Sequence, residues 1–316
     1  MWLGQCKNVG GYSLIELMVA ACLGLIIISA IQSMSSRTLE VLGEIKASSE
    51  VLENGQYLSG LLSDEIGMAG FYGDLNHTFT ASSAPPHVCQ IMNKQQVAQA
   101  MSYPIAGEDN VASGYKLCST ETLLPGTDII VVRRASVNQK NPRYRLKSKE
   151  IYIQGTWAEP NPIIEYGRNS AAFKLTKGIE RVPVRAWQQT VYYVSEDNVF
   201  KRRRFLKGQY SKSEPLVDGV QDFQVEYAVS SSEGTPACNV IFLTPPLTDK
   251  QWGKVVAIRF HLLARSPWRR LNHKGKLFNY ASKTYMVESD GYYQLFTALA
   301  PIMNKLPRRI AFDDEK

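Results

Sequence analysis

Apolar residues run almost without a break through one segment near the start of the chain. The segment 12–31, YSLIELMVAACLGLIIISAI, contains Glu16 as its only charge. About 20 residues of helix cross the hydrocarbon core of a bilayer, so this segment is predicted to span a membrane. Lys7 and the initiator amine precede the segment, and the next positive charge is Arg37. The positive-inside rule therefore predicts a cytoplasmic N-terminus and export of residues 33–316.

The same helix is predicted to continue well past the membrane. No proline occurs between residues 1 and 84, and glycines at 67, 70 and 73 predict that the helix ends near residue 70. Apolar positions at near-helical spacing form a stripe that predicts packing on a sheet. The stripe consists of Leu42, Ile45, Val51, Leu52, Leu58, Leu62, Ile66 and Ala69.

Four glycines interrupt this predicted helix, at positions 24, 43, 55 and 60. Each costs about 1 kcal/mol relative to alanine in a helix interior. Two interpretations stay open. Either the glycines are tolerated, or they permit close helix packing or local unwinding during assembly.

The segment 78–126 is rich in Ser, Pro, Gly and Asn and is predicted to be a partly irregular connection. The patterns after residue 126 are typical of strands. Thr127–Arg134 is a near-continuous apolar run, which predicts a buried central strand. The sequence Ser-Glu-Asp-Asn at 195–198 predicts a hairpin turn. Strands are predicted at 150–154, 189–194, 199–205, 220–229, 254–266, 283–288 and 308–312. One long helix followed by mostly antiparallel strands is an α+β fold.

Composition and motifs exclude several functional classes. The chain has 316 residues, 44% hydrophobic and 21% charged, with a formal net charge of +7. Wholesale disorder and a polytopic membrane protein are excluded. The four histidines form no HExxH motif, and no G-x-S-x-G elbow, Walker A sequence or ordered calcium loop occurs. No enzymatic activity, metal or cofactor is predicted, and His261 is expected to be a hydrogen-bonded strand residue.

Three cysteines lie in the exported part, Cys89, Cys118 and Cys238. An oxidising compartment allows a disulfide, and three single pairings are possible. The shorter loop closes at lower entropic cost, which favours Cys89–Cys118 and leaves Cys238 as a buried free thiol. Cys22 is interpreted as an apolar membrane residue.

Two basic clusters are candidate binding sites. One is Lys201–Arg204, and the other joins arginines to an aromatic ring in Arg265, Trp268, Arg269 and Arg270. Arginines beside an aromatic ring can bind a phosphate backbone, so one interpretation is that this cluster binds a polyanion such as nucleic acid. The alternatives are a solvated strand end, or arginines that pair with acidic partners in a complex.

Glu16 is costly in lipid, by about 2.5–3.5 kcal/mol on insertion scales, and such residues are candidates for function. Its surroundings, GGYSLIELMVA, resemble the class III signal of type IV prepilins. A secretory signal peptide fits less well, because the apolar core of such peptides is shorter than the segment 12–31. A lipoprotein signal fails because no apolar segment precedes Cys6. The resemblance implies cleavage by prepilin peptidase between Gly11 and Tyr12, N-methylation of Tyr12, and pairing of Glu16 with the N-terminal amine of a neighbouring subunit.

Five further blocks, in order, resemble the PilW-type minor pilins: LENGQYLSGLLSDEIGMAGFYG, LPGTDIIVVRRA, YYVSEDNVFKRR, LVDGVQDFQVEYAV and VVAIRFHLLARS. One departure is Asp74, which follows GMAGFYG where the family often has a cysteine. The resemblance implies a type IV pilin-like fold, in which the long helix packs on the sheet of the head. It also implies a complex with other minor pilins and the major pilin, and a possible tip adhesin, that primes a pilus used in twitching motility, adhesion or DNA uptake.

The resulting organisation has four parts. These are a cleaved leader (1–11), a transmembrane part (12–32), an amphipathic continuation (33–72) and a periplasmic head (73–316), held first in inner-membrane lipid and later at the pilus tip. Other hypotheses are a J-type minor pseudopilin of type II secretion, a DNA-binding or adhesive tip pilin, and a single-span protein with an enzymatic periplasmic domain.

Overall fold

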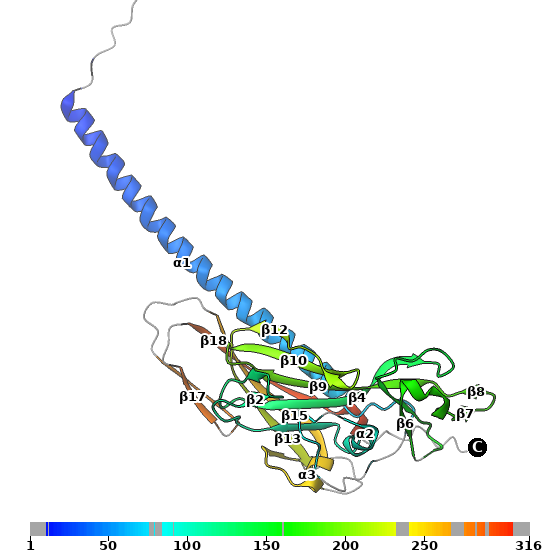
Figure 1. The fold of residues 1–316 in the computed structure, drawn as a ribbon. Helices are drawn as coiled ribbons and strands as arrows, with labels where there is room; N and C mark the ends of the chain where they lie inside the picture. Colours follow the sequence, from blue (N-terminus) through cyan, green and yellow to red (C-terminus); the bar gives the residue numbers. More distant parts are fainter. Residues whose placement is uncertain are drawn as a thin grey trace, which may run out of the picture.

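The fold is one long helix that enters a head built from antiparallel strands (Figure 1). It is seen in a computed structural model, which describes residues 11, 13–75, 79, 84–90, 92–159, 161–231, 240–266, 275–281, 283–287 and 291–305. The α+β class predicted from the sequence is confirmed. The predicted strand 308–312 lies outside the described residues.

Helix α1 covers Leu14–Gly67, 54 residues, and is therefore about 81 Å long at 1.5 Å per residue. Ser13 precedes it in an extended conformation, and Gly70 follows it at φ +73°. A positive φ suits glycine because it has no Cβ, so this residue turns the chain away from the helix. The helix is confirmed to within a few residues at each end.

Only the lower part of α1 is buried by the head. The buried side of the helix starts at Ala47, and Leu58, Leu62 and Ile66 are completely inaccessible. The prediction that the whole stripe packs on a sheet is wrong for Leu42, Ile45 and Leu52, which are exposed. The head covers one face of α1, which runs through Ala47, Val51 and Leu58, and these three side chains project from other sides of the helix.

The larger sheet has eight strands, and all its pairings are antiparallel. Its main path runs β1 (Ile105–Glu108), β4 (Ile129–Lys140), β9 (Val184–Val194), β10 (Val199–Leu206) and β11 (Gln209–Tyr210), with β12 (Glu214–Asp218), β5 (Ile151–Gln154) and β6 (Ile163–Tyr166) off this path. The predicted central strand is confirmed as β4, and the predicted hairpin as β9–β10. Asn198 closes that turn at φ +60°.

The second sheet has four strands and lies against α1. Its order is β14 (Val240–Leu243), β13 (Val220–Ser230), β15 (Val255–Ser266) and β18 (Tyr292–Pro301), again antiparallel. Helix α1 packs on β18 and β15. The largest hydrophobic core joins α1 to strands of both sheets, because it includes Leu62, Val131 and Phe260 together. The helix and the two sheets therefore form one body.

Short elements complete the head. They are α2 (Lys94–Ala100), α3 (Asp249–Gly253), the 3-10 helices η1 (Gly167–Ala172) and η2 (Met303–Lys305), and the strand pairs β2 (Lys116–Leu117) with β3 (Glu121–Thr122), β7 (Thr176–Lys177) with β8 (Glu180–Arg181), and β16 (Lys276–Tyr280) with β17 (Lys283–Val287).

The segment 78–126 is more ordered than its composition predicts. It contains α2, which a reciprocal capping box between Asn93 and Gln96 starts, and β1, which extends the larger sheet by pairing with β4. Val97 and Ala100 of α2 are completely buried. The prediction of a partly irregular connection holds for its turns and loops, but it missed α2 and β1, because tertiary contacts stabilise elements that are too short to show a period in the sequence.

One of the four helix glycines permits a close contact between α1 and the second sheet. A Cβ placed on Gly55 would lie 2.2 Å from the ring of Phe296 in β18, whereas Gly24 and Gly60 have nothing within 4 Å of that position. Close packing is thus the role of Gly55 in this chain. The contact is between a helix and a strand.

Replacing Gly55 with alanine is expected to lower the free energy of unfolding by about 1–3 kcal/mol, because the Phe296 ring must move out of a packed position. Gly60→Ala is the matched control in the same helix. It should gain up to about 1 kcal/mol, since nothing opposes its methyl group. Denaturant unfolding of the full chain in nonionic detergent, followed by tryptophan fluorescence, measures both. A Gly55→Ala variant as stable as Gly60→Ala contradicts this packing role.

Candidate assembly surface and polar sites of the head

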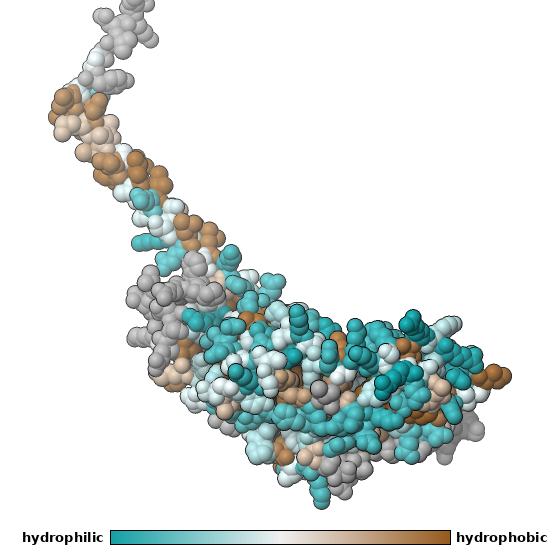
Figure 2. Space-filling view, viewed as in Figure 1, coloured by the Kyte–Doolittle hydropathy of each residue, from teal (hydrophilic) through white to brown (hydrophobic). Residues whose placement is uncertain are grey.

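The upper part of α1 is an exposed apolar surface, defined here as residues 14–45. Large apolar side chains along it are open to solvent on all sides, and Figure 2 shows them as brown atoms on the part of the helix that projects from the head. This helix is long and apolar enough to cross a membrane. Exposed apolar area of this extent marks a surface that contacts lipid or other proteins.

Glu16 is the only ionisable residue of α1 before Arg37, apart from the thiol of Cys22. It lies in the first turn of the helix, its side chain is exposed, and its carboxylate has no partner among the described residues. Gly11 is exposed and outside any helix or strand, three residues before α1 begins, whereas Tyr12 lies outside the described residues. Cleavage between Gly11 and Tyr12 and methylation of Tyr12 therefore stay predictions.

A shallow groove of about 470 Å³ continues the apolar surface towards the head. It lies where α1 approaches the start of β18. Its lining residues are Val41, Glu44, Ile45, Ser48, Ser49, Leu52 and Tyr292. Two of the stripe residues that the head does not cover, Ile45 and Leu52, thus face a concave surface, which suits the side chains of another helix.

The predicted disulfide is confirmed. Cys89 and Cys118 are bonded, with their Cα atoms 5.1 Å apart, and Cys22 is free and exposed on α1. Cys238 lies outside the described residues. The carbonyl of Val88, beside the disulfide, accepts a hydrogen bond from the Tyr210 hydroxyl. This hydrogen bond thus holds the loop 84–90 against the larger sheet.

Arg133 anchors the same loop from inside the head. Its side chain is completely buried in β4. It donates hydrogen bonds to Gln189 Oε1 at 2.7 Å, to the carbonyl of Tyr103 at 3.0 Å and to the carbonyl of Pro86 at 3.0 Å. Burial lowers the pKa of Arg133 to about 10. Sequence reasoning missed this residue as a site. The available signal was an arginine at the end of the apolar run DIIVV.

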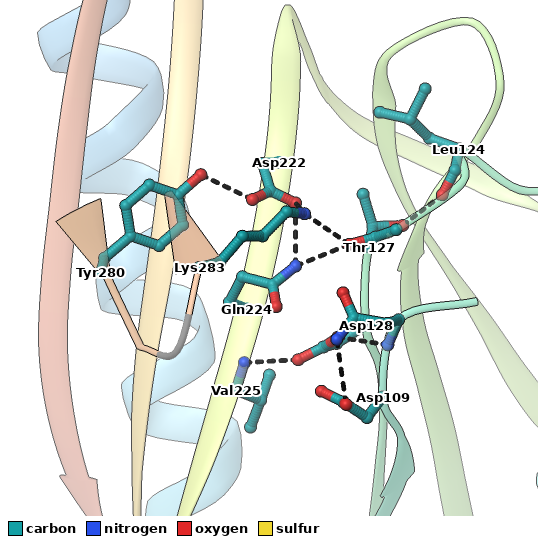
Figure 3. A network of polar contacts seen from close by, with 11 residues as sticks. Asp109, Leu124, Thr127, Asp128, Asp222, Gln224, Val225, Tyr280 and Lys283 are labelled. Atoms are coloured by element: carbon teal, nitrogen blue, oxygen red, sulfur yellow. Dashed lines mark hydrogen bonds and ion pairs between the residues drawn. The ribbon is translucent and has the colours of Figure 1, made fainter. Parts of the chain in front are cut away.

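Two buried carboxylates connect the second sheet to the loop before β4 (Figure 3). Asp222 in β13 accepts hydrogen bonds from Tyr280 at 2.5 Å and Gln224 at 2.9 Å, and pairs with Lys283 at 3.0 Å. Lys283 and Gln224 also donate to the carbonyl of Gly126, each at 2.7 Å. This cluster ties β17, β13 and the loop together.

Asp128 forms the second half of this connection. Its carboxylate accepts the backbone N–H groups of Asn110 at 2.9 Å and Val225 at 2.7 Å. Burial raises the pKa of Asp128 to about 8, although the two N–H groups favour its charged form. These hydrogen bonds satisfy the aspartates within the fold. Over the described ranges, no three potential metal-ligating side chains gather into a metal site.

Three of the four cations in the basic cluster Lys201–Arg204 pair with carboxylates of the same chain. Arg202 makes a bidentate contact with Glu214 at 3.0 and 2.9 Å, and Arg204 contacts the same carboxylate at 2.7 Å. Lys201 pairs with Glu121 at 2.6 Å. The hydrogen bonds from Arg202 and Arg204 lower the pKa of Glu214 to about 2. Carboxylates of the same head thus occupy most of this cluster, and its pairing with acidic partners in a complex stays a hypothesis.

The second basic cluster is described only at Arg265, whose guanidinium lies over the ring of Tyr293, 5.6 Å from its centroid. Trp268, Arg269 and Arg270 lie outside the described residues, so their association with Arg265 stays a prediction. Tyr293 belongs to β18, so Arg265 packs within the second sheet.

His261 is confirmed as a hydrogen-bonded strand residue. Its Nε2 lies 2.9 Å from Glu226 Oε2 and its Nδ1 lies 2.9 Å from Thr297 Oγ1. Arg259 donates to both oxygens of Glu226, at 2.6 and 2.9 Å. Burial acts to raise the pKa of Glu226, but the hydrogen bonds from Arg259 and His261 outweigh it and hold the pKa below its usual value. The group links β13, β15 and β18.

Residues 191–304 match the model of the type IV pilus-assembly protein W family. The matched region runs from the end of β9 to η2 and includes the whole second sheet. This match supports a protein associated with type IV pili, as the resemblance in the sequence implied. No curated protein and no solved structure matches the chain.

Proposed function

We propose that the chain is a minor pilin of the type IV pilus, which joins other minor pilins in a complex that initiates pilus assembly and then sits at the tip. One observation carries this proposal. Glu16 stands without a partner among the described residues and is the only charged residue of α1 before Arg37, in a stretch that is otherwise apolar and exposed. The family match of the head to pilus assembly supports the same conclusion.

In this proposal, prepilin peptidase cleaves between Gly11 and Tyr12, and Tyr12 is N-methylated. Residues 12–32 lie in the inner membrane, and the head lies in the periplasm. The new amine of one subunit pairs with Glu16 of its neighbour. Each charge is costly alone in lipid, so pairing lowers the free energy of the assembled state relative to separate subunits.

The stretch of α1 from residue 41 to residue 52, where the helix approaches the head, adds a second contact. Leu42, Ile45 and Leu52 are left exposed by the head, and the groove beside Tyr292 continues their surface. Helices of other pilins that pack on 14–45 would cover these residues. The apolar stripe would then be buried by partners where the head itself does not reach.

The decisive variant is Glu16→Ala, with Glu40→Ala as a matched control on the exposed part of the same helix. We expect Glu16→Ala to reduce recovery of other pilins with the tagged chain by roughly tenfold or more, because an amine left unpaired in lipid costs about 2.5–3.5 kcal/mol. Glu40→Ala should leave recovery unchanged. Pull-down from membranes and counts of surface pili provide the readout.

Two results would contradict the proposal. One is normal assembly of Glu16→Ala when the processed protein is present at normal levels. The other is a mature N-terminus, found by mass spectrometry, at a residue other than Tyr12. Deleting the gene for this chain distinguishes a role in the type IV pilus from a role in type II secretion. Lost pili with intact secretion supports the minor pilin, and the reverse assigns a J-type pseudopilin.

A further inference from the structure

The positive charge of the chain is concentrated in one part of the head, which we call the distal lobe, residues 141–182. It contains eight Lys and Arg and four Glu, so it accounts for more than half of the net charge of +7. Its elements β6, β7 and β8 lie at the end of the head opposite to the free end of α1 (Figure 1). It therefore points away from the proposed membrane and assembly surface.

A small core holds the segments of the distal lobe together. Leu146, Tyr152 and Phe173 are buried with Val184 in one cluster. A hydrogen bond from the backbone N–H of Arg168 to Ser148 O at 3.2 Å joins two separate segments of the lobe, and one from Val182 N–H to Leu175 O at 3.0 Å closes the β7–β8 hairpin. The cations on these segments are therefore presented by one folded unit.

Most cations of the distal lobe are not neutralised by the chain. All eight are exposed. Lys147 pairs with Glu150 at 3.0 Å, and Glu165 is already occupied by Lys94 from α2 at 2.8 Å. Across the described part of the chain, no ion pair joins a carboxylate to Arg143, Arg145, Lys149, Lys174, Lys177 or Arg181. The Lys201–Arg204 cluster differs, because carboxylates of the head hold it.

Exposed aromatic rings accompany these cations. Tyr144 is 74% exposed between Arg143 and Arg145, and Trp157 is 75% exposed on the turn after β5. The loop of Tyr144 is ordered, because Asn141 Oδ1 accepts the N–H of Arg143 at 2.9 Å and Asn141 O accepts that of Tyr144 at 3.1 Å. Leu146 anchors it from below. The ring is thus held in solvent by a fixed turn.

We propose that the distal lobe binds single-stranded nucleic acid. Unpaired lysines and arginines would contact phosphates, and the faces of Tyr144 and Trp157 would stack with bases, the combination that grooves for single strands use. An acidic protein could pair with the cations, but its binding would not explain why Tyr144 and Trp157 are exposed beside them. A duplex keeps its bases stacked on each other, out of reach of both rings.

The test uses the full chain in nonionic detergent and a fluorescent oligothymidine, with binding followed by anisotropy at several salt concentrations. The charge variant combines Arg143→Gln, Arg145→Gln, Lys177→Gln and Arg181→Gln. We expect it to bind about tenfold or more weakly and to lower the salt slope by about 3, since each phosphate contact to a single strand contributes about 0.7. The matched control removes four exposed lysines elsewhere, by Lys116→Gln, Lys212→Gln, Lys250→Gln and Lys276→Gln.

The aromatic variant, Tyr144→Ala with Trp157→Ala, is expected to weaken binding about tenfold and to leave the salt slope unchanged, because stacking releases no counterions. Tyr57→Ala, at a ring that is 51% exposed on α1, is its control. Far-UV circular dichroism and melting temperature establish that each variant is folded.

Four outcomes overturn the proposal. The first is no binding by the folded wild type. The second is an equal loss in the lysine control, which indicates net charge alone. The third is equal affinity for duplex and single strand with no effect of the aromatic variant. The fourth is stronger binding of heparin or of an acidic peptide than of oligothymidine, which assigns the lobe to that class of partner.

Discussion

Replacing Arg133 with alanine is expected to lower the free energy of unfolding by roughly 3–5 kcal/mol. The side chain is completely buried, and its removal leaves a cavity together with three acceptors without donors, Gln189 Oε1 and the carbonyls of Tyr103 and Pro86. Large-to-small core substitutions cost about 2–5 kcal/mol, and each unsatisfied buried acceptor adds about 1–3 kcal/mol. Relief from burying a charge offsets part of this sum.

The neighbouring residue provides a matched control. Arg134 is partly buried and makes a long bidentate contact with Glu65, at 3.4 Å to each carboxylate oxygen. Arg134→Ala should therefore cost less than Arg133→Ala, about 1–2 kcal/mol, because its hydrogen bonds are fewer and longer. Arg133→Met separates volume from hydrogen bonding, because it refills the space but donates nothing. If Met restores wild-type stability, the three hydrogen bonds contribute nothing net, and the anchoring role of Arg133 is disproved.

These measurements use denaturant unfolding of the full chain in nonionic detergent. Trp187 and Trp252 are buried in the head and report its unfolding. An unchanged denaturant slope between wild type and variant shows that the same surface is exposed on unfolding. Under that condition, the shift in midpoint measures stability directly.

Removing the disulfide by Cys89→Ser with Cys118→Ser is expected to cost about 3–4 kcal/mol. The two cysteines are 29 residues apart, and the chain-entropy model attributes this amount to the loop they close in the unfolded state. The cost is expected to be similar in the wild type after reduction, since reduction removes the same cross-link. Unfolding curves with and without reductant measure both.

Cys22→Ser is the control for the disulfide variant. Cys22 is exposed on α1 and free, so its replacement should leave the stability of the head unchanged, with or without reductant. Peptide mapping of the oxidised protein should recover Cys89 linked to Cys118. A link from Cys238 to either of them, or a reductant effect below about 1 kcal/mol, would refute the assigned role.

The strands that sequence alone predicts well are those with long apolar runs. Thr127–Arg134 and 254–266 correspond to β4 and β15, both buried in the interior of a sheet, so their pattern reflects burial on both faces. The hairpin at 195–198 is predicted by turn residues, which act locally. In each case the determining interactions lie within a few residues of the segment.

The elements that sequence misses depend on distant contacts. Strand β1 has only four residues, Ile-Ala-Gly-Glu, and exists because β4 supplies its hydrogen-bond partners. The extent of burial along α1 is another case. Leu52 follows the buried Val51 directly but is exposed, because the two side chains project about 100° apart around the helix and only the face of Val51 meets the head.

Polar sites were harder to predict than elements. The disulfide between Cys89 and Cys118 followed from loop entropy and the compartment. In contrast, the buried contacts of Arg133 and Asp222 join residues far apart in sequence, and a single sequence contains no signal for such pairs. The basic residues show the same limit, because Lys201–Arg204 is a dense run yet three of its four cations pair with Glu121 and Glu214.

The contact of Gly55 with Phe296 has a consequence for how the protein is made. It joins the first helix to the last described strand, so the two sides of the contact leave the ribosome at opposite ends of synthesis. Until β18 has emerged, this face of α1 lacks one of the two strands on which it packs. Non-local contacts of this kind make folding slow. Insertion of the helix into a bilayer can therefore precede closure of the head, which cannot be complete before β18 has been synthesised.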